Sequence, residues 1–327
     1  MAFENYAFIA GSMCQSGDRF LRAGYKPETL ALPYVLREMG KRGEARGVEL
    51  HHRGNETDAD LAAIEEAMEE AKLSLTYLNA WTYGERKWRF GSLSAADKQI
   101  RKEAVERCKE TIRVARRLKA KGVSLWLGQD GFDYIFQVDY RAQWQALVDS
   151  MKELCDFADG MPVSVEPKAR EPRNRSLIDN VQTALLLRLE SGRSNLGVTI
   201  DTGHVICGGQ GLGASIEAAI RHNCLYNLHS NDNFGMWDDD MIIGSVRLME
   251  HLETFYLLKK YGYDGFISVD IFPYREDAFD AVCESIRAMR SYDRLIEKMG
   301  VETIDRLIEN GNVPETLAQI RKSVFCE

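Results

Sequence analysis

The feature that most restricts the fold of this 327-residue chain is a regular alternation of short apolar runs with longer amphipathic segments. Each short run has the length and the β-branched or aliphatic composition of a buried strand. The runs are 8–10, 48–50, 73–78, 123–127, 163–165, 196–200, 225–228 and 266–269. Strands that alternate with helices favour a parallel sheet, and eight such units predict an α/β chain folded as a (β/α)8 TIM barrel.

The amphipathic segments between the runs predict the helices of this barrel. We expect helices over about 28–42, 59–71, 95–121, 139–158, 176–191, 214–222, 245–261 and 275–291. Two further helical segments, 293–310 and 314–324, follow the eighth unit. We therefore predict a barrel domain over residues 1–292 and a C-terminal helical extension over residues 293–327.

Carboxylates and imidazoles stand where several of the predicted strands end, or in the segments that follow them. They are Glu166, Asp201, His204, His229, Asp238, Asp240 and Asp270. The carboxyl ends of barrel strands converge on one cavity, so side chains about 100 residues apart in sequence can surround one ion. Carboxylates combined with neutral imidazoles suit a divalent cation such as Mg2+, Mn2+ or Co2+.

Composition and charge exclude several classes of function. The net charge of -8 disfavours a surface that binds nucleic acid or an anionic membrane. No apolar run approaches the roughly 18 residues of a spanning helix, and the N-terminus lacks a secretory signal, so we expect a cytoplasmic protein. The seven cysteines form no C-x-x-C pair, which argues against a thiolate zinc site.

Several ordered motifs resemble the metal-binding core of xylose isomerases and of the wider xylose-isomerase-like barrel superfamily. They are Glu166-Pro-Lys168-Ala-Arg-Glu171-Pro-Arg173, Gly197-Val-Thr-Ile-Asp201-Thr-Gly-His204, Asp238-Asp-Asp240 and Asp270-Ile-Phe-Pro273. Upstream, Leu125-Trp126-Leu-Gly-Gln-Asp-Gly131 looks like the Trp-Gly-Gly-Arg-Glu-Gly signature of those enzymes. Asn79-Ala-Trp81-Thr82 looks like their aromatic loop. The resemblance covers roughly residues 6–292.

The resemblance implies a cofactor of one or two divalent ions, Mn2+ or else Mg2+ or Co2+. A first ion would be held by Glu166, Asp201, His229 and Asp270, a set similar to that of L-rhamnose isomerases. A second, catalytic ion would be held by His204, Asp238 and Asp240, with Asp201 bridging the pair.

The resemblance also implies an aldose–ketose isomerase that moves a hydride between C1 and C2 of a small sugar. Lys168 would bind and polarise the O1 oxygen, and Asp240 would take part through the catalytic ion. His51 would bind the substrate and help to open the cyclic sugar. Trp81 and Trp126 would lie against the carbon chain of the sugar.

The position of His51 depends on the register of its strand, because His52 would face inward if the register differed by one residue. The family has an orienting aspartate three residues after this histidine, and Gly54 stands there in this chain. Glu49, Glu56 or another group are candidates to orient His51 instead, and a different route of ring opening is the alternative.

Other functions of the same superfamily compete with isomerisation. A ketose 3-epimerase, or an inosose-type dehydratase or isomerase, would use one metal and acid–base chemistry. Such epimerases usually employ a pair of glutamates as acid and base, whereas Asp270 and Lys168 favour a hydride shift. A carbon-glycoside-cleaving subunit would need a small partner chain. A DNA-repair endonuclease would need a histidine-rich zinc site and a basic face, neither of which is evident. A sugar-binding barrel without activity is the non-enzymatic alternative.

We expect a homo-oligomer, a dimer or tetramer, as in related isomerases. The aromatic segment 79–94 and the C-terminal helices offer apolar surface for such contacts, and segment 79–94 is alternatively an active-site loop.

Overall fold

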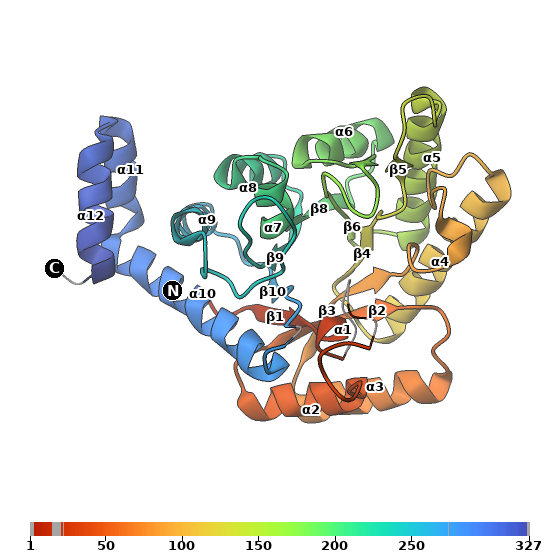
Figure 1. Cartoon of the computed structure of the whole chain (residues 1–327), viewed down its shortest axis with the longest axis horizontal. Helices are drawn as coiled ribbons and strands as arrows, with labels where there is room; N and C mark the ends of the chain where they lie inside the picture. Colours follow the sequence, from red (N-terminus) through yellow and green to blue (C-terminus); the bar gives the residue numbers. More distant parts are fainter. Residues whose placement is uncertain (1–2, 15–20, 22, 274, 326–327) are drawn as a thin grey trace.

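The computed structural model describes residues 3–14, 21, 23–273 and 275–325. Within them, eight parallel strands close into a barrel in the order β1-β10-β9-β8-β6-β4-β3-β2 (Figure 1). The strands are β1 (Tyr6–Ile9), β2 (Gly47–His52), β3 (Ser74–Ala80), β4 (Gly122–Trp126), β6 (Val163–Glu166), β8 (Leu196–Asp201), β9 (Leu225–Ser230) and β10 (Ile267–Val269). This confirms the predicted (β/α)8 barrel, and every barrel strand overlaps one of the predicted runs.

Helices surround the barrel and, apart from the short helices at 10–14 and 202–207, overlap the predicted segments. They are α1 (Ala10–Cys14), α2 (Leu32–Arg42), α3 (Asp58–Ala71), α4 (Lys98–Arg117), α5 (Tyr140–Ala158), α6 (Val181–Ser191), α7 (Thr202–Cys207), α8 (Leu212–Arg221), α9 (Leu248–Lys260) and α10 (Ala278–Met299). A 3-10 turn lies at Arg86–Trp88, and a two-stranded sheet pairs β5 (Gly131–Phe132) with β7 (Arg175–Ser176). Among the described helices, none combines the length and apolar character needed to cross a bilayer.

The start of α4 shows how local chemistry fixes a boundary. The side chain of Asp97 accepts hydrogen bonds from the backbone N–H groups of Gln99 and Ile100, which have no partner inside the helix. The helix therefore begins at Lys98, three residues later than the segment predicted from 95.

The inside of the barrel is polar, whereas the apolar core lies between the strands and the helices. Ser124 of β4 and Thr199 of β8 lie 3.2 Å apart across the barrel, and Ser164 of β6 also contacts Thr199. Further along the inside, the buried carboxylate of Glu49 on β2 accepts a hydrogen bond from Ser268 on β10. These buried polar groups are hydrogen-bonded to one another and form a layer inside the barrel, below the ends of the strands.

The last barrel helix extends into the C-terminal region. α10 runs through residue 292 to Met299, and Gly300, with φ of 80°, separates it from α11 (Val301–Asn310). The predicted helix 293–310 is therefore the end of one helix and the whole of another. α11 and α12 (Val313–Phe325) stand to one side of the barrel in Figure 1. The division at residue 292 into two domains stays a prediction.

Candidate metal centre and active site

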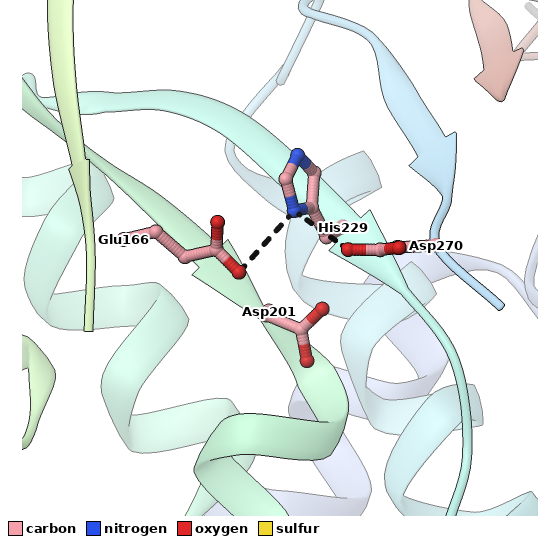
Figure 2. A group of neighbouring side chains, drawn as sticks. All are labelled: Glu166, Asp201, His229 and Asp270. Atoms are coloured by element: carbon pink, nitrogen blue, oxygen red, sulfur yellow. Dashed lines mark ion pairs between the residues drawn. The ribbon is translucent and has the colours of Figure 1, made fainter. Parts of the chain in front are cut away.

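Four ligand-type side chains meet where neighbouring strands end. Glu166 and Asp201 are the last residues of β6 and β8, His229 lies in β9, and Asp270 directly follows β10. Each offers one ligand atom, and these atoms all lie within 4.8 Å of one another. We call these four residues the first ligand group. Figure 2 shows the side chains turned toward a common space, as the convergence of strand ends predicts.

The imidazole of His229 provides a test of whether this group suits a metal ion. Its Nδ1 lies 3.5 Å from Glu166 Oε1 and 3.4 Å from Asp270 Oδ2. The side chain is buried, and no described residue completes a hydrogen bond to Nδ1. A buried nitrogen without a hydrogen-bond partner, aimed among carboxylates, is the arrangement expected of a metal ligand. The residues of the first ligand group therefore fit a divalent cation.

A second ligand group comprises Asp201, His204 and Asp238, whose ligand atoms also lie within 4.8 Å of one another. Asp201 Oδ1 accepts a hydrogen bond of 2.8 Å from the backbone N–H of His204, so it caps α7 and fixes His204 one turn into the helix. His204 Nε2 lies 3.2 Å from Asp238 Oδ2. Asp201 belongs to both groups. That it bridges two ions, as the resemblance implies, stays a prediction.

Asp240 is outside both groups as the described residues form them, although it lines the same cavity. Its backbone has φ of 49°, in the left-handed region that residues with a Cβ rarely adopt. Burial and the charges of Asp238 and Asp270 raise the pKa of Asp240 well above its usual range. Its assignment as a ligand of a second ion stays a proposal.

The carboxylates of the site cannot all ionise easily without added positive charge. Burial, with the further influence of Asp238, Asp270 and Glu166, raises the pKa of Asp201 to about 7 against the opposing attraction of His204. A divalent cation would relieve this repulsion by neutralising the shared carboxylate.

Lys168 places an ammonium group against the second ligand group. Its Nζ lies 2.6 Å from Asp238 Oδ2 and 3.2 Å from Glu171 Oε2, and it stands 5.5 Å above the ring of Trp126. Burial alone would lower the pKa of Lys168, but Asp238 and Asp240 outweigh it and raise the pKa. Lys168 is therefore a fixed, charged hydrogen-bond donor within the site.

The loop between β9 and α9 carries Asp238 and Asp240 and is closed by Asp232. The backbone N–H and C=O of Asp232 pair with those of Met241 at 3.1 and 2.9 Å. The Oδ2 atom of Asp232 also accepts a hydrogen bond of 2.8 Å from the backbone N–H of Val246. These bonds fasten the two ends of the loop to each other.

The two ligand groups open into a cavity of about 600 Å³. Every predicted catalytic and substrate-binding residue lines it: His51, Trp81, Trp126, Lys168 and Asp240. The ring of Trp81 lies 5.5 Å from His51 and 4.3 Å from Tyr83, which in turn lies 4.5 Å from Trp126. Segment 79–94 therefore contributes one aromatic wall of the cavity.

The two adjacent histidines of β2 have different surroundings. His51 lines the cavity, whereas Nδ1 of His52 lies 2.9 Å from Thr111 Oγ1 on α4. Burial lowers the pKa of His51, which favours its neutral form. Glu56 lies 3.6 Å from His52 Nε2, and Glu49 contacts His229 rather than His51. The expectation that one of these glutamates orients His51 is therefore not supported by the contacts they make.

Sequence reasoning did not assign several residues their observed positions in the site. Tyr83 and Phe272 line the cavity, and Asn231 donates a hydrogen bond of 2.8 Å to Asp201 Oδ2. Glu49 lies beneath His229 without lining the cavity. Strand alternation places Glu49 on the same face of β2 as His51, which is the one signal that could have placed it inside the barrel.

Comparison with known proteins places the chain among barrels of one family. The family model described as a xylose isomerase-like TIM barrel matches residues 35–292. A solved D-tagatose 3-epimerase-like protein is 18% identical, with a TM-score of 0.67, covering 90% of this chain and 98% of that one. A 3-keto-D-glucoside 4-epimerase from E. coli is 17% identical, with a TM-score of 0.65, covering 79% of this chain and 94% of that one.

A third structure, a D-psicose 3-epimerase from Clostridium cellulolyticum H10 with D-tagatose, is 16% identical, with a TM-score of 0.65. The match covers 89% of this chain and 98% of that one. At such identities the likeness establishes the fold, and the family model, which spans most of the barrel, establishes the family. The chain thus belongs to the xylose isomerase-like TIM barrel family.

Proposed function

We propose that this chain is a divalent-metal-dependent sugar isomerase that interconverts an aldose and a ketose by a hydride shift between C1 and C2. The observation that carries the proposal is the buried ammonium of Lys168 beside two ligand groups that share Asp201. We assign Glu166, His229 and Asp270, with Asp201, to a first ion. A second ion would take His204 and Asp238, with Asp240 nearby.

When bound, divalent ions would polarise the carbonyl of the sugar and stabilise the negative charge that develops on its oxygens. Lys168 adds a donor whose position is fixed before the substrate arrives, because Asp238 holds its Nζ at 2.6 Å and Trp126 packs against it. A preorganised charge of this kind stabilises the transition state more than the ground state. We assign Lys168 to the O1 oxygen of the sugar.

His51 suits the opening of a cyclic sugar. Because burial lowers its pKa, the imidazole of His51 is neutral near pH 7. It can accept the proton of the anomeric hydroxyl and return it to the ring oxygen as the bond between that oxygen and the anomeric carbon breaks. Trp81, Tyr83 and Trp126 form the neighbouring aromatic wall, which offers apolar faces to the carbon chain and keeps water away from the reacting carbons.

The test is an isotope-transfer assay on the Mn2+-loaded protein with a panel of aldoses and ketoses. A substrate deuterated at the migrating position should give a product that keeps the label in ordinary water. Complete loss of the label to solvent in every converted sugar would mean that the hydrogen leaves as a proton, which is incompatible with a hydride shift.

A ketose 3-epimerase is the second candidate, and it is favoured by the fold likeness to proteins described as ketose 3-epimerases. The first ligand group alone would serve such an enzyme, with carboxylates acting as acid and base. One bound metal per chain, together with conversion of ketoses into their C3 epimers and no aldose product, would favour this function.

A further inference from the structure

Glu49 lies at the centre of a hydrogen-bond network beneath the first ligand group. Its carboxylate is fully buried, with 0% of the residue exposed. Asn227 Nδ2 donates a hydrogen bond of 2.8 Å to Oε1, and Asn79 Nδ2 donates one of 3.2 Å to Oε2. The hydroxyl of Ser268 donates a further bond to Oε1. Partners from β3, β9 and β10 thus hold the carboxylate in one orientation.

The same carboxylate contacts the far side of the His229 ring. Oε2 of Glu49 lies 3.1 Å from Nε2 of His229, while Nδ1 on the other side of the ring faces Glu166 and Asp270. An ionised carboxylate can only accept hydrogen bonds, so this contact requires a proton on Nε2. A ring that binds a metal through one nitrogen must carry its proton on the other.

A second neighbour of Nε2 favours the opposite arrangement. Asn227 Nδ2 lies 3.0 Å from Nε2 and could donate to it if that nitrogen carried no proton. The proton would then sit on Nδ1, and His229 would present an N–H instead of a lone pair to the first ligand group. The choice between the two tautomers depends on the acceptor that Glu49 supplies.

We propose that Glu49 is a positioning residue that keeps the proton of His229 on Nε2 and thereby presents the Nδ1 lone pair to a divalent ion in the first ligand group. The inference rests on the proposed function only in requiring a metal there. It concerns neither the sugar nor the reaction. Mutating a hydrogen-bond partner of a metal-binding histidine typically weakens metal affinity by about 10- to 100-fold.

The test compares the affinity of the metal-free protein for Mn2+ and Cd2+ in wild type and Glu49→Gln. Glutamine has the same shape, but its amide can donate to Nε2 and so permits the wrong tautomer. We expect Glu49→Gln to bind the first ion about 10- to 100-fold more weakly. Ser268→Ala, which keeps the carboxylate and removes one of its donors, should have a much smaller effect.

Asp130→Asn is the matched control. Asp130 is another fully buried carboxylate, and it accepts hydrogen bonds from the backbone and side chains of Ser92 and Ser94. It lies outside both ligand groups. The same change from carboxylate to amide should lower the melting temperature while leaving metal affinity at the wild-type value. An equal loss of affinity in both variants would reduce the role of Glu49 to general stability and overturn the proposal.

A spectroscopic measurement on the wild type keeps the proposal testable even if Glu49→Gln does not fold. In protein loaded with 113Cd2+ and labelled with 15N-histidine, His229 should show cadmium coupling at Nδ1 and a proton on Nε2. His229→Gln identifies its signals. Cadmium coupling at Nε2, or unchanged affinity in a folded Glu49→Gln variant, would overturn the inference. A wild type that shows the expected coupling but converts no sugar would leave the inference standing and remove the proposed function.

Discussion

Replacing Lys168 with methionine tests the reaction most directly. The change keeps approximate volume and removes an ammonium that lies 2.6 Å from Asp238 Oδ2 and 3.2 Å from Glu171 Oε2. If Lys168 stabilises charge that develops on O1, its loss should act mainly on kcat. Removing one preorganised oxyanion donor costs about 10²- to 10³-fold in kcat, or roughly 2.7–4 kcal/mol. The variant should still bind metal.

The same substitution has a calculable effect on stability. Only 9% of Lys168 is exposed, and removing one partner of a buried ion pair costs about 3–5 kcal/mol where the other charge is left uncompensated. The cost should be smaller here, because His204 Nε2 also lies 3.2 Å from Asp238 Oδ2. A metal ion in the second ligand group would compensate Asp238 instead. We therefore expect Mn2+ to raise the melting temperature of Lys168→Met by more than it raises that of the wild type.

The assay measures single-turnover rates with saturating Mn2+, metal content and melting temperature for Lys168→Met and a control. The control is Lys259→Met, which removes a partly buried lysine 2.8 Å from Asp293 that belongs to neither ligand group and does not line the cavity. It should lose stability and keep its rate. A Lys168→Met variant that turns over near the wild-type rate and incorporates deuterium extensively from heavy water would refute the assignment of Lys168 and the hydride shift together.

Four further outcomes are expected. Chelation should abolish turnover and lower the melting temperature, because metal at 100 times its Kd stabilises the folded state by about 2.7 kcal/mol; an unchanged melting temperature would contradict this. Asp201→Asn should reduce the content of both ions and Asp240→Asn only that of the second, so equal metal-to-protein ratios in both variants and wild type would refute the assignment. In the metal-free protein the pKa of Asp201 is raised from 3.8 to about 7, so between these values the folded state holds a proton that the unfolded state releases. Thermal stability should therefore fall as the pH rises from about 4 to about 7. A melting temperature that calorimetry finds to be higher at pH 8 than at pH 5 would contradict this prediction. Light scattering at micromolar concentration should give a dimer or tetramer, and a monomer would contradict the expected assembly.

The barrel and the convergence of its ligands were predictable because both follow from the order of elements. Once eight alternating units are accepted, Glu166, Asp201 and Asp270 must meet, since parallel strands end at the same rim. The spacing of Asp201 and His204 is also local, because the carboxylate caps the helix on which the histidine lies. Such relations need no knowledge of how distant side chains pack.

Other contacts depend on how side chains pack across the barrel, and they could not be predicted from the sequence. Alternation shows that Glu49 and His51 share a face, but not that Glu49 meets His229, which is 180 residues away in the chain. The ambiguity between His51 and His52 is one of register, and the contact of His52 with Thr111 resolves it. The end of α10 was missed because its apolar pattern continues past 292 until Gly300.

The closed loop between β9 and α9 affects how this chain can diverge. Glu166, Asp201, His229 and Asp270 belong to strands or directly follow them, so altering any of them disturbs the barrel rim. Asp238 and Asp240 instead sit on a loop whose ends Asp232 ties together through backbone and side-chain bonds. Insertions and substitutions within such a loop leave the strands paired. On the proposed function, descendants of this chain can therefore change their sugar preference by mutation in the loop while inheriting the first ligand group intact.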